Sequence, residues 1–168
     1  MDVEIRNEVV ADVDAIDAVT TAAFLAAPHT DHTEQFIVKA LRKAGQLTVS
    51  LVAEVDGTVV GHVAVSPVSI SDGATRWYGI GPISVLPAYQ GQGIGADLMS
   101  AALSALRERG ACGCVVLGEP GYYGRFGFKA EPGLVLADVP PAYFQAVSFG
   151  TAMPRGTVSY DEAFSARE

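Results

Sequence analysis

The sequence predicts a mixed α/β fold with a largely antiparallel sheet, and three observations support this prediction. Residues 47–86 alternate apolar and polar side chains around two turn signals, which predicts consecutive antiparallel strands. A glycine-rich segment at residues 90–95 then leads into a helical pattern. A short β-branched run at residues 114–117 follows that helix and must return parallel to the strand before it. We therefore expect one β-α-β unit joined to an antiparallel sheet.

The chain begins with a predicted strand at residues 3–6 and two predicted helices. Asp12 or Asp14 can cap the first helix, which we expect to end near residue 26. Asp31 and Glu34 have the spacing of a capping box for the second helix, and Gly45 follows its last turn. The residues expected to face the core are Val13, Ile16, Val19 and Phe24 in the first helix and Phe36, Ile37, Ala40 and Leu41 in the second.

The rest of the chain is predicted from turn signals and periodicity. Asp-Gly pairs at residues 56–57 and 72–73 indicate two turns, and the helix after the glycines should end near residue 109. We expect strands at residues 126–136 and 156–160, with a turn at residues 142–146. The predicted inner face of the helix after the glycines consists of Leu98, Met99, Ala102, Leu103 and Leu106.

Length and composition indicate one compact domain spanning residues 1–168. Apolar residues make up 49% of the 168 residues and charged residues 18%, which is typical of a globular protein. The net charge of −8 argues against a nucleic-acid surface, which is usually basic. The start of the chain lacks a secretory pattern, and the longest uncharged run, residues 77–96, is broken by prolines and glycines. We therefore expect a cytoplasmic protein without a membrane span.

The glycine-rich segment has the chemistry of an anion site. Gly91, Gly93 and Gly95 let the backbone approach a ligand closely, and the positive end of the following helix favours negative charge. A dinucleotide fingerprint would need a glycine at Ala96, and the phosphate loop of nucleotide hydrolases would need Gly-Lys-Ser/Thr. Neither is present, so the pattern indicates a diphosphate site of another kind.

Two motifs resemble those of one protein family, and they occur in the same order along the chain as in that family. Gln90, Gly93 and Gly95 match the Gln/Arg-x-x-Gly-x-Gly/Ala signature of the GNAT superfamily of acyl-CoA-dependent N-acetyltransferases. Tyr123 begins a segment similar to the Tyr-x-x-x-Gly-Phe element that closes the family's site. The resemblance is strong over residues 78–130, and residues 117–123 and 156–164 also resemble the YhbS-type subgroup. A GNAT-like fold is therefore expected, in which the parallel strands at residues 83–86 and 115–117 splay apart and leave room for the pantetheine arm of the cofactor.

The resemblance implies that acetyl-CoA is the co-substrate and that a primary amine attacks its thioester directly. The amine would belong to a small molecule or to an exposed protein amine. The Val85 N–H would polarise the thioester carbonyl, and Tyr123 would be the general acid that protonates the departing thiolate. The residues implied to bind the cofactor are Ile83, Ser84, Val85, Gln90, Gly91, Gln92, Gly93, Ile94, Gly95 and Tyr123.

The general base is left open by the sequence. Glu119 is a candidate because it follows the strand expected to line the cleft, and its alternative is a solvated loop carboxylate. His62 lies on a predicted strand and faces either the acceptor site or the core. Both alternatives stay open for each residue.

Two further groups of reactive side chains favour structural interpretations. His29, Asp31 and His32 lack a fourth donor, so we interpret their loop as a helix cap and acceptor gate and expect no metal. Cys112 and Cys114 are two residues apart on a predicted strand, which suits buried thiols better than a disulfide.

Two alternatives to acetyl transfer are also consistent with the sequence. The chain could be a non-catalytic acyl-CoA-binding module that keeps the diphosphate loop, or an acyltransferase that uses a longer donor such as succinyl-CoA. The acceptor amine is not identified by any residue pattern. Many relatives in the family pair through their terminal strands, which leaves a homodimer open.

Overall fold

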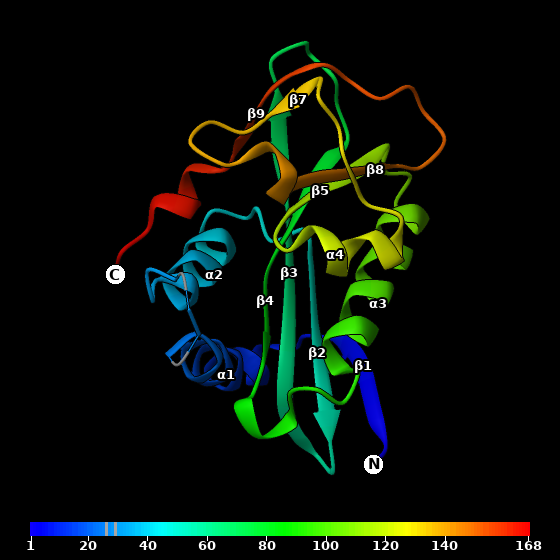
Figure 1. Cartoon of the computed structure of the whole chain (residues 1–168). Helices are drawn as coiled ribbons and strands as arrows, with labels where there is room; N and C mark the ends of the chain where they lie inside the picture. The colour runs from blue at the N-terminus through cyan, green and yellow to red at the C-terminus, as the bar shows by residue number, and fades with distance from the viewer. Residues whose placement is uncertain (26, 29) are drawn as a thin grey trace.

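The computed structural model describes residues 1–25, 27–28 and 30–168. Its central sheet has the strand order β1-β2-β3-β4-β5-β8-β6, and β9 pairs with both β3 and β7. Helices cover both faces of this sheet (Figure 1). The mixed α/β class and the largely antiparallel sheet predicted from the sequence are therefore confirmed.

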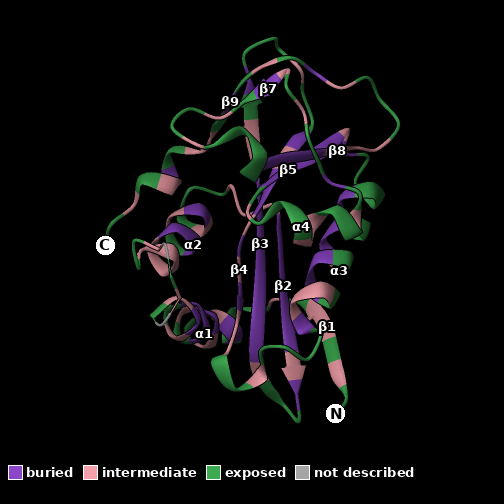
Figure 2. Cartoon of the chain, in the orientation of Figure 1, coloured by how far each residue is buried: buried purple, intermediate pink, exposed green. Residues whose placement is uncertain are grey.

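The first four strands are antiparallel neighbours, and the last three of them form a meander. Strands β1 (Val3–Asn7), β2 (Val49–Val55), β3 (Thr58–Ile70) and β4 (Trp77–Val85) pair in that order. The turns between them fall at the predicted Asp-Gly pairs. Strands β2 and β3 are mostly buried along their length (Figure 2), because helices pack on both of their faces.

The helices divide the core into two layers. Helices α1 (Val13–Leu25) and α2 (Glu34–Lys43) cover one face of the sheet, and α3 (Ile94–Glu108) covers the other. The predicted inner face of α3 is confirmed, since all five of its apolar residues are buried. On the opposite face, Ile16 of α1 and Val38 of α2 pack on Val52 and Ala64.

The structure differs from the predicted details of the first two helices. Helix α1 buries Ala23, whereas Phe24 is only half-buried, and the predicted end of α1 at Ala26 lies outside the described residues. The predicted capping box at Asp31 is wrong, because α2 begins after Thr33 and Asp31 is exposed. Glu34 instead accepts a hydrogen bond from the Thr30 hydroxyl at 2.6 Å.

The predicted β-α-β unit is confirmed. Strand β5 (Gly113–Leu117) returns after α3 and pairs parallel with β4, from Trp77 opposite Gly113 to Gly79 opposite Val115. Cys114 is fully buried on β5, and burial raises the pKa of its thiol. Cys112, just before the strand, is a half-buried free thiol.

The structure corrects the predictions for residues 126–148. The predicted strand at residues 126–136 is instead η3 (Gly124–Phe126) and two short strands, β6 (Lys129–Ala130) and β7 (Leu134–Val135). The predicted turn at residues 142–146 holds only at its start, where η4 (Pro141–Tyr143) forms, because Phe144–Ser148 forms strand β8 along β5. Pairing with β5 buries Phe144 and Ala146, a tertiary contact that outweighs the weak local signal.

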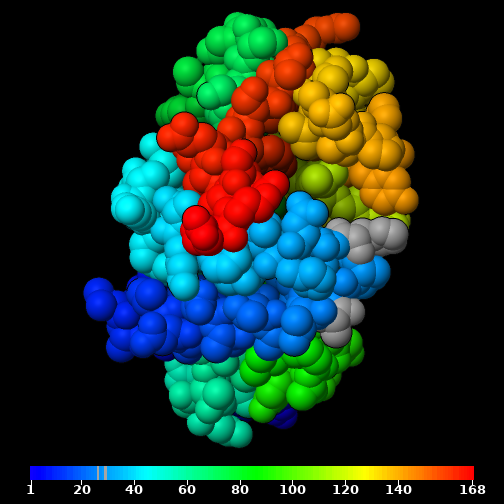
Figure 3. Space-filling model, turned by 90° about the vertical axis from the view of Figure 1, so that its left-hand side faces the viewer, coloured from blue at the N-terminus to red at the C-terminus, as the bar shows by residue number. Residues whose placement is uncertain are grey.

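The C-terminal segment returns to the α2 side of the molecule. Strand β9 (Gly156–Tyr160) confirms the last predicted strand and pairs with β3 and β7. Helix η5 (Glu162–Ser165) then packs Ala163 against Ile37 and Leu41, and Figure 3 shows this segment beside α2. In the part of the chain that the structure describes, none of the helices combines the length and apolar character that crossing a membrane requires.

Candidate active site

The loop between β4 and α3 is shaped by two glycines. After η2 (Pro87–Tyr89), Gly91 and Gly93 adopt left-handed conformations with φ of 75° and 86°. A side chain at either position would strain the backbone, although nothing lies within 4 Å of an added Cβ. The space outside the loop is therefore open to a ligand.

The first turn of α3 directs amide groups toward this space. The first bond within the helix runs from the Asp97 N–H to the Gly93 carbonyl at 3.0 Å. The N–H groups of Ile94, Gly95 and Ala96 consequently have no acceptor inside the helix. Ile94 is 1% exposed and anchors this turn in the core. Because the positive end of the helix dipole lies here as well, the turn can bind an anion.

Strands β4 and β5 separate just before this loop. Their pairing stops at Gly79 and Val115, so the rest of β4 has no β5 partner beside it. On the opposite edge, the Leu86 N–H donates to the Val60 carbonyl at 2.8 Å. Successive residues of a strand alternate their amide direction, so the Val85 N–H points to the open edge. The predicted splay of the parallel pair is present in this register.

Three segments meet at the mouth of the opening. A Cβ added to Gly95 would lie 3.9 Å from both the Tyr122 hydroxyl and a Val85 methyl group. The first turn of α3, the end of β4 and helix α4 (Pro120–Tyr123) therefore converge. Gln90 ties the loop to the strand, because its side-chain amide donates to the Val85 carbonyl at 2.9 Å.

Tyr123 lies on α4, in a mostly apolar setting. Its ring packs against Gly118, where an added Cβ would collide with it, and stands edge-on to Phe128 at 6.1 Å between centroids. Burial raises the pKa of the Tyr123 phenol, and the hydroxyl therefore stays protonated at neutral pH. Such a group can donate a hydrogen bond to an anion that forms beside it and deliver its proton along that bond.

The α1 face of β4 carries buried polar side chains. Ser84 is 2% exposed, and its hydroxyl has no hydrogen-bond partner among the described residues. His62 lies directly opposite Ser84 on β3 and is 0% exposed. Of the two alternatives for His62, the structure selects the interior: the ring lies inside the protein, on the face covered by α1 and α2.

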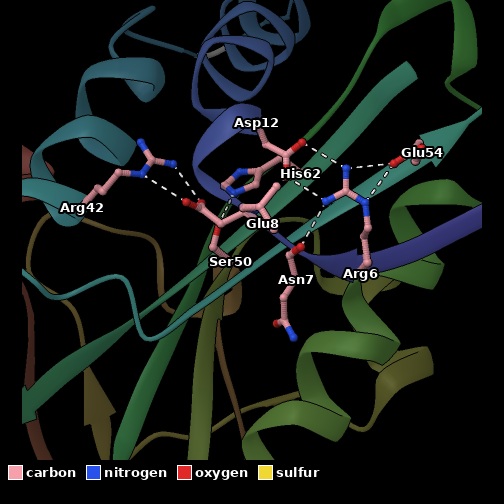
Figure 4. A network of polar contacts seen from close by, with 9 residues as sticks. Arg6, Asn7, Glu8, Asp12, Arg42, Ser50, Glu54 and His62 are labelled. Atoms are coloured by element: carbon pink, nitrogen blue, oxygen red, sulfur yellow. Dashed lines mark hydrogen bonds and ion pairs between the residues drawn. The ribbon is translucent and has the colours of Figure 1, made fainter. Parts of the chain in front are cut away.

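A network that the sequence analysis did not anticipate surrounds His62 (Figure 4). Its Nε2 atom lies 2.7 Å from the Ser50 hydroxyl, and Ser50 in turn donates to the Glu8 carboxylate. Arg42 of α2 donates to the same carboxylate at 2.9 Å. These residues are far apart in the sequence, and only the paired register of β2 and β3 could have indicated that Ser50 and His62 are neighbours.

A second polar network lies next to it and involves different residues. Arg6 donates to both carboxylate oxygens of Asp12, at 2.7 and 3.0 Å, and to Glu54 at 2.8 Å. The hydrogen bonds from Arg6 and the Val9 N–H lower the pKa of Asp12 to about 2. This arrangement ties η1 (Val10–Asp12) to β1 and β2.

The remaining described residues singled out in the sequence as a candidate base or metal ligands are exposed. Glu119 is exposed and precedes α4 as its N-cap, without a side-chain capping bond. Asp31 and His32 are exposed, and His29 lies outside the described residues. In the described ranges, no three histidine, cysteine, aspartate or glutamate side chains are grouped closely enough to hold a metal ion.

An anion-binding loop lies here beside a separated pair of parallel strands, an arrangement that suits an acyl-CoA-binding protein. Comparison with known proteins identifies the family. Residues 14–128 match the model of the acetyltransferase (GNAT) family. The uncharacterized N-acetyltransferase YhbS of Escherichia coli K12 is 39% identical over 126 residues, which cover 74% of this chain and 72% of YhbS. The chain therefore belongs to the GNAT family of acetyltransferases.

Solved structures agree with this assignment. A GNAT family acetyltransferase from Brucella melitensis, in complex with acetyl-CoA, has a TM-score of 0.87 and 50% identity, covering 97% of this chain and 98% of that one. The E. coli YhbS structure in complex with CoA has a TM-score of 0.86 and 34% identity, covering 97% and 92%. The GNAT-like fold expected from the two motifs is confirmed.

Proposed function

We propose that this chain, as a single domain over residues 1–168, transfers the acetyl group of acetyl-CoA directly to a primary amine of a small molecule or an exposed protein amine. One observation carries the proposal: β4 parts from β5 beside the open first turn of α3. The cofactor complexes of the Brucella and E. coli relatives support the same cofactor here.

In this proposal, the diphosphate of CoA binds at the first turn of α3. The backbone amides face it, and the glycines allow its close approach. The pantetheine arm would run along the free edge of β4 in the manner of an added strand. The loop residues in contact would be Gln90, Gly91, Gln92, Gly93, Ile94 and Gly95, and the strand residues Ile83, Ser84 and Val85.

The chemical step then uses Val85 and Tyr123. The Val85 N–H would bind the thioester oxygen, and a donor of this kind typically stabilises the developing oxyanion by about 3 kcal/mol. The amine forms the new C–N bond as the C–S bond breaks. Tyr123 would give its proton to the departing thiolate. None of these steps uses a metal ion.

Glu119 is one candidate for the group that accepts the amine's proton. It lies two residues after the end of β5, and because it is exposed it would act through water. A lysine-like amine has a pKa near 10.4, so at pH 7 its attack requires a route for one proton. Glu119→Gln would then lower turnover without changing CoA affinity.

The test is amine-dependent release of CoA thiol. We expect the purified protein to release thiol from acetyl-CoA when mixed with a panel of primary amines, with acetylated amine detected by mass spectrometry. Acetyl-CoA that binds without thiol release for any amine would contradict transfer and support a binding module. Faster release from succinyl-CoA than from acetyl-CoA would contradict the proposed donor.

A further inference from the structure

Glu8, Ser50 and His62 form a continuous line of hydrogen bonds across the sheet on its α1 side. Glu8 precedes η1, Ser50 lies on β2, and His62 lies on β3. Figure 4 shows the Ser50 hydroxyl between the Glu8 carboxylate and the His62 ring. The line therefore runs from the N-terminal segment to the interior beneath β4.

The donors and acceptors along this line have one consistent arrangement. The Glu8 carboxylate can only accept, so the Ser50 hydroxyl donates its single proton to it. Ser50 then accepts from His62, which places the ring proton on Nε2. The Nδ1 atom of neutral His62 therefore carries a free lone pair that can take a proton.

This Nδ1 atom lies on the α1 side of β3, opposite the residue that precedes the proposed oxyanion donor. It is buried and has no hydrogen-bond partner among the described residues, and the same is true of the Ser84 hydroxyl. His62 and Ser84 are directly opposite in the β3–β4 register, where Cβ atoms are about 5 Å apart. Ser84 immediately precedes Val85, the proposed oxyanion donor.

The other end of the line reaches solvent. Glu8, Arg42 and Ser50 line a surface pocket of about 310 Å³ together with Asn7, Gly45 and Leu47. A proton that arrives at Glu8 can therefore pass to water. The line joins a buried lone pair near the proposed thioester site to the exterior.

We propose that His62, Ser50 and Glu8 form a relay that carries the proton released by the attacking amine out to solvent. This role rests on the proposed acetyl transfer. An alkylammonium and a thioester give an amide, a thiol and one proton, and that one proton enters the relay. It reaches His62 Nδ1 through a water held by Ser84, while the Nε2 proton moves to Ser50 and the hydroxyl proton to Glu8.

The charges around His62 suit a group that passes a proton on. Burial lowers the pKa of His62 to about 4, Glu8 acts against this shift, and Arg42 adds to it. Burial would raise the pKa of Glu8, but the hydrogen bonds from Arg42 and Ser50 outweigh it, and the net shift is downward. Helix α1 turns uncharged buried residues toward the sheet, and its Asp17 is paired with Lys39 at 3.3 Å. His62 is therefore neutral and able to accept at pH 5 and above.

The first test compares His62→Gln and Ser50→Ala with Ser66→Ala, a matched buried serine on β3 outside the network. With an alkylamine at pH 7, we expect kcat to fall about 100-fold in both relay variants and to stay near wild type in Ser66→Ala. Titration calorimetry should give unchanged CoA affinity in all three. The loss should shrink as pH rises, because the alkylamine deprotonates in solution.

An arylamine sharpens this test because it is already neutral at pH 7 and does not need the relay. The relay variants should therefore acetylate it nearly as fast as wild type does. Equal losses with both amines at every pH would show that His62 acts only in packing and would overturn the relay. A larger loss in Glu119→Gln than in His62→Gln would overturn it as well.

The protonation state and tautomer of His62 can be measured directly, without relying on the folding of the relay variants. The chain has three histidines, so in the double variant His29→Gln/His32→Gln the only histidine nitrogen resonances in an NMR spectrum come from His62. Between pH 5 and 8 we expect the neutral form with its proton on Nε2. A proton on Nδ1, or an imidazolium at neutral pH, would contradict the relay.

The outcomes also separate the relay from the proposed function. Wild-type protein that releases no thiol with any amine would contradict acetyl transfer and the relay together. Wild-type release that persists at full rate in His62→Gln would contradict the relay and leave acetyl transfer standing.

Discussion

The two sides of the C-terminal half of β4 present different kinds of groups: main-chain groups toward α3 and polar side chains toward α1. Toward α3, the opening is formed by backbone: the Val85 N–H, the left-handed Gly93 and the first amides of the helix. Toward α1, the strand carries the buried side chain of Ser84, with His62 opposite it on β3 and Ser50 bonded to His62. Backbone donors keep their positions under most substitutions, whereas each link of a side-chain network depends on one residue.

The two parts of the proposed reaction are therefore controlled by different kinds of groups. A cofactor that is shared by a family can be held by main-chain groups in a loop of fixed shape. Handling of the amine depends on side chains that come from β2, β3 and the N-terminal segment. We therefore expect substitutions on the two sides to separate cofactor affinity from turnover.

The largest effect should come from Tyr123→Phe, which keeps the ring and removes the proton. We expect kcat to fall about 100-fold while CoA affinity is unchanged, because the hydroxyl would act on the leaving thiolate. Steady-state thiol release and titration calorimetry measure the two quantities. A greater loss of kcat in Tyr122→Phe would assign the acid to the neighbouring ring, and equal losses of kcat and affinity would remove Tyr123 from the role of acid.

Asp12→Asn should separate the two polar networks on the α1 side. Loss of the paired hydrogen bonds with Arg6 should lower the free energy of unfolding by about 2 kcal/mol at pH 7, with kcat near wild type. The pKa of Asp12 is lowered from 3.8 to about 2, so its stabilisation is complete above pH 4 and is lost as pH falls through 2. Urea unfolding at pH 7, 4 and 3 measures this, and a difference that grows on acidification would be the wrong sign.

Gly93→Val should damage the backbone side alone. The left-handed conformation costs a β-branched residue about 1–2 kcal/mol, which predicts roughly tenfold weaker CoA binding if the loop distorts to relieve it. Gly73→Val is the matched control, since Gly73 has the same φ of 86° and open space around it but lies in the β3–β4 turn. Equal CoA affinity in the two variants would contradict the role of the loop.

Gln90→Ala should give a smaller change than Gly93→Val. Its amide holds the Val85 carbonyl at 2.9 Å, and loss of one such bond costs about 1 kcal/mol, or about fivefold in CoA affinity. Gln92→Ala removes a longer contact to the Ala88 carbonyl at 3.4 Å and should change affinity less. The opposite order in calorimetry would show that the loop is held in another way.

The two sides also differ in how far the sequence predicts them. The glycine loop, α3 and the return of β5 follow from neighbouring residues, so their periodicity and spacing were sufficient. The His62 network joins positions 8, 42, 50 and 62, which no local pattern connects. Strand β8 was missed for the same reason, since Phe144 and Ala146 become strand residues only through their pairing with β5.

Binding of the CoA diphosphate at the first turn of α3 is tested most directly by a crystal structure of the chain with CoA. We expect the diphosphate oxygens within hydrogen-bond distance of the amides of residues 91–95, and the sulfur between Val85 and Tyr123 in the opening beside β4. CoA bound at any other surface, or a diphosphate without contact to the first turn of α3, would contradict it.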